Sequence, residues 1–220
     1  METPTPDFHY PYPRPALTVD AVVFTFDEGL FKVLLIRRAD EPFKDCWAFP
    51  GGFVNEDETV ESAVSRELAE ETGLKDIDLQ QFYTASAPGR DPRGWTVSVI
   101  FYGIVPKHSV KLNAGDDAKE AVFHAIQQIP RLAFDHNEIL EKGLAHIKNK
   151  TRFLWIATVL LEKDFSENEF LQLGLQLGLR ENDLHQRWNR FMRMGLIIES
   201  SEKNYYRFNE EKFKKSEKFE

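Results

Sequence analysis

The chain of 220 residues has a single cysteine, Cys46, so an internal disulfide is excluded, and no set of Cys and His residues has the spacing of a zinc site. Its longest uncharged apolar runs, such as FLWIATVLL at 153–161, are much shorter than the ~20 residues that a membrane helix requires. The amino terminus lacks the basic start and apolar stretch of a secretory signal. These absences predict a cytoplasmic protein without a membrane span, in which Cys46 packs beside Trp47 as a small side chain.

Basic residues are also in the minority, since 28 Lys and Arg stand against 36 Asp and Glu, a net charge of −8. The excess acid lies in residues 1–150, with 24 acidic and 16 basic side chains, whereas residues 151–220 hold 12 of each. A hydrophobic content of 42% allows a sizeable core. An acidic first part suits cation binding, and the neutral second part suggests a separate task.

Hydrophobic periodicity predicts a mixed α/β unit over residues 17–149, after an N-terminal lead at 1–16. Strands are expected at 17–26, 31–38, 80–87, 95–105 and 119–126, and helices at 58–72 and 136–150. We call the first of these helices the acidic helix.

A second unit is expected at 150–208, followed by a charged tail at 209–220. Its helices are predicted at 151–165, around 170–177 after a capping box formed by Ser166 and Glu169, and at 182–194, and a hairpin follows. Three helices and a hairpin are typical of a winged helix, with a helical dimerisation bundle as the alternative. Because almost no Pro, Gly or Ser separates the units, we expect a rigid junction.

The acidic helix places carboxylates on its apolar side. At about 100° per residue, Glu67, Glu70 and Glu71 share the apolar face, and Thr72 lies among small polar residues on the opposite face. Inward carboxylates lose hydration at a cost of several kcal/mol per ion unless they are paired or bind a metal. Arg66, on one flank, can orient one glutamate but cannot balance three. The pattern predicts a site for Mg²⁺, with Mn²⁺ as an alternative, unless the acids are simply solvated.

The same segment resembles the Nudix box at all of its fixed positions. Gly52 is followed by Glu58, Arg66-Glu67-Leu68, Glu70-Glu71 and Gly73-Leu74 at the spacing of that motif. Nudix proteins are α/β/α sandwiches that use a divalent metal to hydrolyse a nucleoside diphosphate linked to another group. The resemblance implies a role for each matching residue: metal ligands at Glu67, Glu70, Glu71 and the Gly52 carbonyl, an orienting guanidinium at Arg66, and a supporting carboxylate or further ligand at Glu58.

A carboxylate must also accept the proton of the attacking water. Glu67 and Glu71 are candidates. In many Nudix enzymes that act on sugar nucleotides the base comes from a separate loop, and here the segment LNAGDDAKEA supplies Asp116, Asp117 and Glu120. A solvated turn before a strand is the other interpretation of that loop.

The loop PGRDPRGW carries Arg90 and Arg93 on either side of Asp91. Guanidinium groups suit diphosphate oxygens and stack on bases, whereas a plain hairpin connection explains the Pro and Gly residues but not the charges. Arg37 and Arg38 end a strand that could point at the same site. Because neighbours in a strand face opposite sides, at most one of them is expected to do so.

This loop, the GDDA segment and the run FDHNEIL resemble the ADP-ribose branch of the Nudix family. The whole chain resembles Nudix-related transcriptional regulators, in which such a domain is fused to a winged helix. Many of these regulators have damaged boxes and sense their ligand, whereas the box here is intact. We therefore expect Mg²⁺-dependent hydrolysis of ADP-ribose or a related nucleoside diphosphate sugar, with a ligand-sensing regulator of NAD or sugar metabolism genes as the alternative.

Basic residues of the second unit are candidates for contact with operator DNA. Arg187, Arg190 and Arg193 recur at three-residue steps on the helix expected at 182–194, where they can meet phosphates or a major groove. A solvated face is the alternative. Lys203 and Arg207 on the hairpin would be wing contacts. Palindromic operators require two recognition helices, so we expect a homodimer, as the family resemblance also implies.

Overall fold

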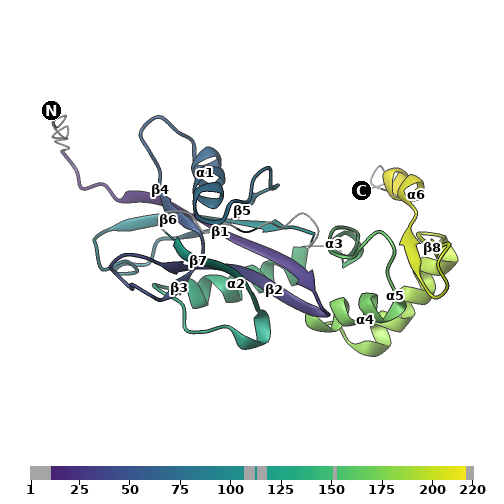
Figure 1. The fold of residues 1–220 in the computed structure, drawn as a ribbon. Coiled ribbons are helices and arrows are strands. Elements are labelled where there is room, and N and C mark those ends of the chain that lie inside the picture. Colours follow the sequence, from purple (N-terminus) through teal and green to yellow (C-terminus); the bar gives the residue numbers. More distant parts are fainter. Residues whose placement is uncertain (1–10, 107–111, 113–117, 151–152, 217–220) are drawn as a thin grey trace.

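The computed structural model describes residues 11–106, 112, 118–150 and 153–216. Its first part is built on one mixed sheet (Figure 1) whose strands are β1 (Ala16–Asp27), β2 (Leu30–Arg38), β3 (Trp47–Ala48), β4 (Gly51–Phe53), β5 (Gln80–Ala85), β6 (Thr96–Ile104) and β7 (Ala118–Ala125). The main path runs β3-β2-β1-β6-β5, and β4 and β7 pair with β1 and β2. β1 and β6 are parallel, whereas the other pairs are antiparallel.

The long central strands follow from their β-branched and aromatic residues. β1 and β2 form a hairpin with Phe24 opposite Val33. Its turn places Glu28 and Gly29 at φ values of 53° and 74°, where the absence of a side chain on Gly29 avoids strain.

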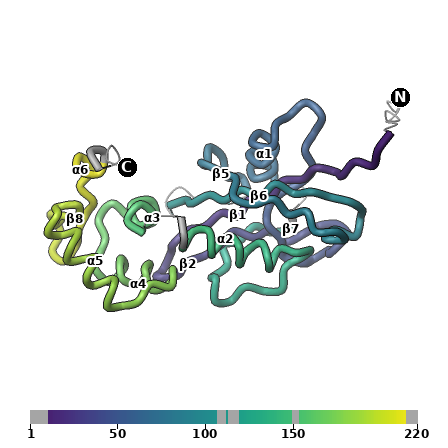
Figure 2. Tube along the Cα trace, turned by 180° about the vertical axis from the view of Figure 1, so that it is seen from behind, coloured from purple at the N-terminus to yellow at the C-terminus, as the bar shows by residue number. Residues whose placement is uncertain are grey.

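Two helices cover opposite faces of the sheet, α1 (Val60–Thr72) on one side and α2 (His136–Lys150) on the other (Figures 1 and 2). Alternation along β1 supplies both cores, because Val23 packs with residues of α1 and Phe24 packs with residues of α2. The layered α/β/α arrangement predicted from the sequence is confirmed.

The C-terminal part has the order of elements predicted for a winged helix. It contains α3 (Phe153–Leu160), α4 (Glu167–Gln176), α5 (Glu181–Met194), β8 (Ile197–Glu199), β9 (Tyr206–Phe208) and α6 (Glu210–Ser216). The capping box of Ser166 and Glu169 is present at the start of α4. α3 is shorter than expected, because Phe165 leaves the helical path and exchanges two backbone hydrogen bonds with Tyr206 of the hairpin.

The two parts of the chain share one hydrophobic cluster. It includes Phe24 and Phe31 at the end of the β1–β2 hairpin together with Phe153 and Phe170 of the C-terminal helices. The backbone N–H of Phe31 donates to the side-chain oxygen of Gln176 on α4 at 3.5 Å. The two parts therefore pack against each other through these side chains, and the rigid junction and the domain bounds remain predictions. No helix in the described ranges is both long and apolar enough to cross a membrane.

Candidate active site

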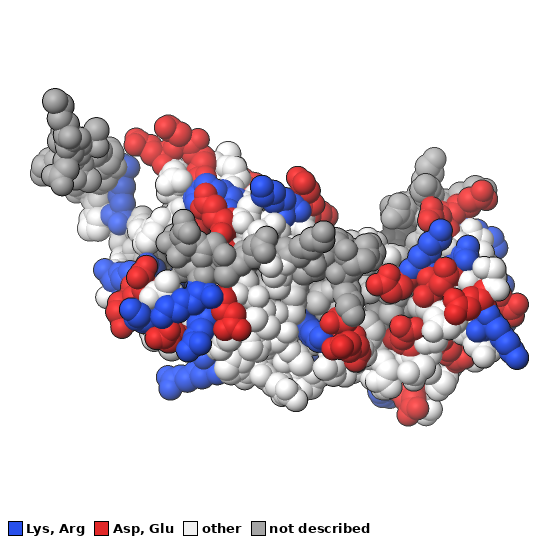
Figure 3. Space-filling view, in the orientation of Figure 1, with Lys and Arg blue, Asp and Glu red and all other residues white. Residues whose placement is uncertain are grey.

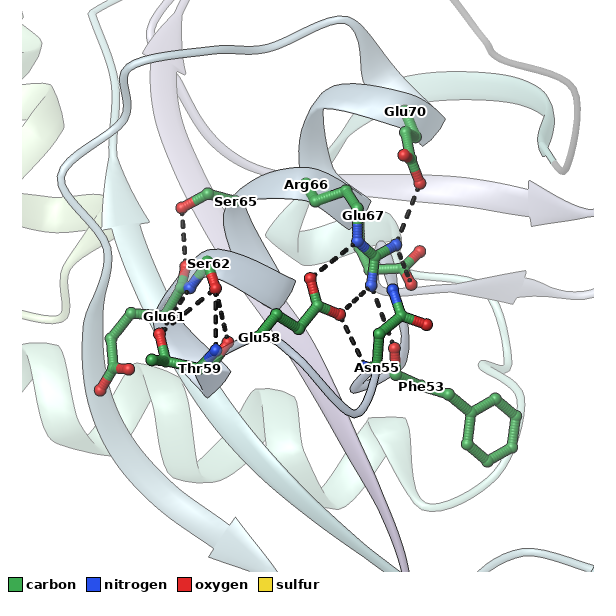
Figure 4. A network of polar contacts seen from close by, with 10 residues as sticks. All are labelled: Phe53, Asn55, Glu58, Thr59, Glu61, Ser62, Ser65, Arg66, Glu67 and Glu70. Carbon is green, nitrogen blue, oxygen red and sulfur yellow. Dashed lines mark hydrogen bonds and ion pairs between the residues drawn. The ribbon is translucent and has the colours of Figure 1, made fainter. Parts of the chain in front are cut away.

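The acidic helix, α1, is fixed at both ends by local interactions. The hydroxyl of Thr59 accepts the N–H of Ser62 and the Ser62 hydroxyl accepts the N–H of Thr59, which forms a capping box that the sequence analysis missed (Figure 4). At the other end, Gly73 adopts a left-handed φ of 77° and its N–H donates to Ala69. The carboxylates of the helix therefore project from a rigid element.

Arg66 lies at the centre of a network of polar contacts at the start of this helix (Figure 4). Its Nη2 donates to Glu58 Oε1 at 2.5 Å, and its Nη1 donates to Glu67 Oε1 at 2.8 Å and Glu70 Oε2 at 3.1 Å. Nη2 also donates to the carbonyl of Phe53 at 3.1 Å. One guanidinium thus meets three carboxylates, more than the single glutamate expected from its position on the flank.

The same contacts change the acidity of their members. Hydrogen bonds from Arg66 and from the backbone of Asn55 lower the pKa of Glu58 to about 2, so Glu58 is ionised at neutral pH. The carboxylates around Arg66, first of all Glu58, raise the pKa of that guanidinium. Arg66 and Glu58 therefore form a permanent ion pair that links the loop before α1 to the helix.

Glu71 is a buried carboxylate of α1 that Arg66 does not contact. Its side chain accepts the N–H of Gly51 at 2.8 Å, and 7% of the residue is exposed. Burial raises the pKa of Glu71 to about 8, and the neighbouring carboxylates of Glu67 and Asp20 act in the same direction. Burial also raises the pKa of Glu67, against the effect of Arg66. Glu67 and Glu71 are thus two desolvated acids, of which Arg66 contacts only Glu67.

The face predicted for the acidic helix needs two corrections. The side chain of Glu70 is 59% exposed, so two rather than three carboxylates turn inward. Glu70 lies about 60° behind Glu67 on the helix, which brings it to the rim. Thr72, expected on the outer face, is fully buried and donates its hydroxyl to the carbonyl of Leu68.

The two glycines of β4 allow the loop to approach the helix and β1 closely. A Cβ on Gly52 would lie 2.3 Å from Glu67 Oε1, so the Glu67 carboxylate occupies the space of a missing side chain. A Cβ on Gly51 would lie 2.1 Å from the carbonyl oxygen of Val19 in β1. The loop is consequently pressed against the carboxylate on one side and the sheet on the other.

A pocket of about 30 Å³ lies beside these glycines and brings together four of the eight residues predicted to contact the ligand. Gly52, Arg38, Arg90, Asp91 and Arg93 all line it. A wider groove of about 870 Å³ between α3 and β9 is lined by none of them, so size alone does not identify the site.

Of the two arginines that end β2, the structure brings Arg38 to the pocket, with its guanidinium 5.0 Å from the centre of the Phe134 ring. Arg37 faces another way, and its Nε donates to the carbonyl of Asp45 at 3.3 Å. This arrangement is the one that strand alternation demands.

The loop at 88–95, which is predicted to contact the ligand, is stabilised by an ion pair between two of its own residues. Arg93 donates to both carboxylate oxygens of Asp91, and its guanidinium lies 4.9 Å from the Phe53 ring and 5.5 Å from the Phe134 ring. Burial acts to raise the pKa of Asp91, yet the hydrogen bonds from Arg93 hold it below its usual value. Asp91 therefore organises the loop, and Arg93 presents a half-exposed cation flanked by aromatic rings.

Sequence reasoning missed two buried polar residues beside the pocket, Asp20 of β1 and His136 at the start of α2. One Asp20 oxygen accepts the hydroxyl of Ser98, and the other lies 3.5 Å from His136 Nε2. His136 Nδ1 accepts the backbone N–H of Phe49 at 3.0 Å. An aspartate inside the apolar run LTVDAVVF was the available signal for this pair.

The structure describes only part of the loop at 112–121 that was predicted to supply a general base. Asp116 and Asp117 lie outside the described residues, and Glu120 is an exposed residue of β7 that pairs with Arg37 in the sheet register. The choice of general base therefore stays a prediction.

The predicted DNA-contacting arginines of α5 are all exposed. Leu184 and Trp188 of the same helix are buried in the core, and Arg187 lies at the border of this buried side, where it lines a pocket with Ile147 and Phe153. Basic and acidic side chains are interspersed over the C-terminal part of the face in Figure 3.

The two hairpin residues predicted as wing contacts differ in their surroundings. Lys203 is exposed between β8 and β9. Arg207 donates to Asp164 Oδ1 at 2.8 Å and to the Ser200 hydroxyl at 3.1 Å, so it supports the hairpin in this structure. Its part in DNA contact remains a prediction.

Two curated relatives share different extents of the chain. An ADP-ribose pyrophosphatase of Methanocaldococcus jannaschii is 47% identical over 130 residues, which cover 59% of this chain and 73% of that protein. An ADPR responsive transcriptional repressor, NtrR, of Acinetobacter baylyi is 30% identical over 197 residues, which cover 88% of this chain and 78% of the repressor.

A solved structure matches both parts of the chain. Shewanella oneidensis NrtR in complex with a 27mer DNA has a TM-score of 0.67 and 28% identity, over 88% of this chain and 93% of that one. The NUDIX domain of the same protein in complex with ADP ribose has a TM-score of 0.57 and 33% identity, over 63% and 94%. The C-terminal helices and hairpin resemble the winged helix of that regulator. A model of the NUDIX domain matches residues 14–144, more than half of the sequence, and the chain therefore belongs to the Nudix family.

Proposed function

We propose that this chain hydrolyses ADP-ribose, or a closely related nucleoside diphosphate sugar, to two monophosphates with the help of Mg²⁺. The observation that carries the proposal is the pair of desolvated carboxylates, Glu67 and Glu71, pressed against the glycine loop at Gly51 and Gly52. The similarity to an ADP-ribose pyrophosphatase supports the choice of substrate.

The donor set fits a hard divalent cation. Glu67 and Glu71 offer carboxylate oxygens that have lost hydration, and Gly52, whose carbonyl we propose as a further ligand, packs against the Glu67 carboxylate. Within the described ranges no three acidic, histidine or cysteine side chains already converge as a metal cage, because Glu67 and Glu70 are turned toward Arg66. We infer that loading requires these two side chains to release Arg66, with Mn²⁺ as an alternative ion.

A bound Mg²⁺ supplies neutralisation of phosphate charge and acidification of a water molecule. The protein has to supply the remaining parts of the reaction. Arg38 and Arg93 lie where guanidinium groups can bind diphosphate oxygens, and the exposed face of Phe53 is available for stacking. Glu71 and Glu67, or a carboxylate of the loop that carries Asp116 and Asp117, would accept the proton of the attacking water.

The test is release of AMP from ADP-ribose by the purified full chain with Mg²⁺, compared with a panel of other nucleotide sugars. Glu71→Gln retains an acceptor for the Gly51 N–H and removes the ionisable carboxyl group, so we expect turnover to fall by at least ~10²-fold while the fold persists. Glu61→Gln on the exposed side of α1 is the matched control. An absence of hydrolysis across the panel would exclude the proposal.

A second function, regulation of transcription in response to the same ligand, is favoured by the exposed arginines of α5. The repressor from Acinetobacter baylyi covers most of the chain, and the related structure from Shewanella oneidensis is bound to DNA. We infer that a homodimer presents two α5 helices to operator DNA, with Lys203 and Arg207 toward the wing. Mobility-shift titration with DNA from upstream of NAD or sugar metabolism genes tests it, and no retardation at any concentration contradicts it.

A further inference from the structure

Both walls of the ligand pocket are attached to the same place, the start of α2 at residues 135 and 136. The loop with Arg90 and Arg93 forms one wall, and the loop that leads through Phe49 into β4 forms the other. Asp135 contacts the first loop, and His136 contacts the second. The two attachments come from consecutive residues.

Arg90 is tied to Asp135 by a bidentate ion pair. Its Nε and Nη2 donate to the two carboxylate oxygens at 2.9 and 2.7 Å, and its side chain is 5% exposed. The carbonyl of Asp135 in turn accepts the N–H groups of Glu138 and Ile139, so the carboxylate is fixed to the helix. The guanidinium of Arg90 is therefore largely committed to the protein, whereas that of Arg93 is more open to solvent.

His136 holds the opposite wall. Its Nδ1 accepts the N–H of Phe49, which leaves the proton of the neutral ring on Nε2, directed at Asp20. Phe49 leads through Pro50 to Gly51, whose N–H meets Glu71. A shift of the histidine would therefore move the glycine loop relative to the carboxylates of α1.

Local strain also marks the segment that carries the two residues. Phe134, which precedes Asp135, adopts a left-handed φ of 52°, where side chains are rarely found. Its ring contacts Arg38, Arg93 and His136. Such strain persists only where the surroundings enforce it, and it is typical of functional segments.

We propose that Asp135 and His136 are positioning residues that set the distance between the two walls of the pocket, and that Arg90 acts through Asp135 and not by binding the diphosphate itself. The proposal rests on the proposed function only for the identity of the ligand. In this arrangement Arg93 and Arg38 remain the guanidinium groups that meet the ligand.

A double-mutant cycle on the full chain distinguishes positioning from direct contact. Arg90→Gln, Asp135→Asn and the double variant are compared for ADP-ribose affinity by calorimetry in EDTA, and for kcat and KM with Mg²⁺. Asp183→Asn is the control for a change away from the pocket, because it removes an exposed ion pair with Arg180 at the start of α5. If Arg90 only fastens the loop, all three pocket variants raise Kd and KM by a similar roughly 3- to 10-fold, the cost of ordering a released loop, with kcat within about twofold.

The two attachments are separated by amide hydrogen exchange, which needs no ligand. Asp135→Asn should accelerate exchange in residues 88–95 and leave residues 49–53 protected. His136→Phe keeps an aromatic ring but removes the acceptor, so it should accelerate exchange in residues 49–53 and leave residues 88–95 protected. His136→Asn offers an amide oxygen to the N–H of Phe49 and should restore part of the protection.

Three results would overturn the proposal. The first is a loss of affinity in Arg90→Gln that far exceeds the loss in Asp135→Asn. The second is tighter binding by Asp135→Asn, expected if its charge merely repels the diphosphate. The third is exchange that is unchanged in both loops. If the native protein binds no ADP-ribose, the proposed function fails, and the exchange measurements still decide the positioning role.

Discussion

Replacing each of the two glycines of β4 by alanine separates a catalytic defect from a folding defect. In Gly52→Ala the new Cβ would lie 2.3 Å from Glu67 Oε1 and 2.5 Å from its Cδ, well inside contact distance. The obstacle is the end of a flexible side chain, which can rotate away. In Gly51→Ala the Cβ would lie 2.1 Å from the Val19 carbonyl oxygen and 2.9 Å from the Asp20 Cα, which are backbone atoms of the central strand.

The energies of the two changes follow from what has to move. Gly52→Ala displaces Glu67 from Arg66, a partly exposed ion pair worth about 1 kcal/mol or less, so we expect Tm to fall by about 2–4 °C. If Glu67 is the metal ligand that we propose, moving its carboxylate should weaken Mg²⁺ binding roughly 10- to 100-fold. Gly51→Ala must separate β4 from β1 and break the hydrogen bond to Glu71, which costs about 3 kcal/mol or more and lowers Tm by about 10 °C.

Thermal unfolding without metal and calorimetric titration with Mg²⁺ measure both effects on the same preparations. A Gly52→Ala variant that binds Mg²⁺ like the native protein would show that Glu67 does not need the space left by the glycine. Equal losses of stability in the two variants would contradict the assignment of one clash to a side chain and the other to the backbone.

Three further predictions concern pH, DNA contact and coupling. Burial lowers the pKa of His136, so the stability that its neutral ring contributes is present above about pH 6.5 and is lost as the pH falls. In His136→Phe the free energy of unfolding should therefore decrease less steeply below pH 6.5, by up to about 1.4 kcal/mol per pH unit. Parallel plots of unfolding free energy against pH for the native protein and the variant would contradict this. Arg190→Ala should weaken operator binding and leave hydrolysis intact, whereas Arg180→Ala, at the residue before α5, serves as the control. Loss of hydrolysis in Arg190→Ala would count against separate sites for the two functions. ADP-ribose should change operator affinity by about 5- to 150-fold in mobility-shift titrations at one salt concentration, and superimposable curves would mean that the two parts are not coupled.

Most of the fold could be predicted because the signals were local. An apolar, β-branched run marked β1, alternating apolar residues marked β6, and the Ser166 capping box marked the start of α4. The early end of α3 could not be predicted, since it depends on the pairing of Phe165 with Tyr206, forty-one positions away. The winged-helix order was nevertheless evident from helix lengths and the final hairpin.

The sequence predicted the carboxylates of the candidate site but not the buried residues that hold its loops in place. The spacing of the acidic helix brought out Glu67 and Glu71, and angular position alone misplaced Glu70 and Thr72, because the real face depends on how α1 is rotated against the sheet. Asp20 and His136 are 116 positions apart, and their contact arises only when β1 and α2 pack together. A contact between residues so far apart cannot be predicted from the spacing of residues in a single sequence.

The central claim is that the intact Nudix box of this chain performs hydrolysis, and phosphorus NMR of ADP-ribose mixed with the full-length protein and Mg²⁺ tests it most directly. We predict that the diphosphate resonances disappear and two monophosphate resonances grow in equal amounts, that EDTA stops the conversion, and that Glu71→Gln slows it by at least ~10²-fold. Diphosphate resonances that persist in the presence of protein that binds ADP-ribose would contradict the claim and leave ligand sensing as the function of the domain.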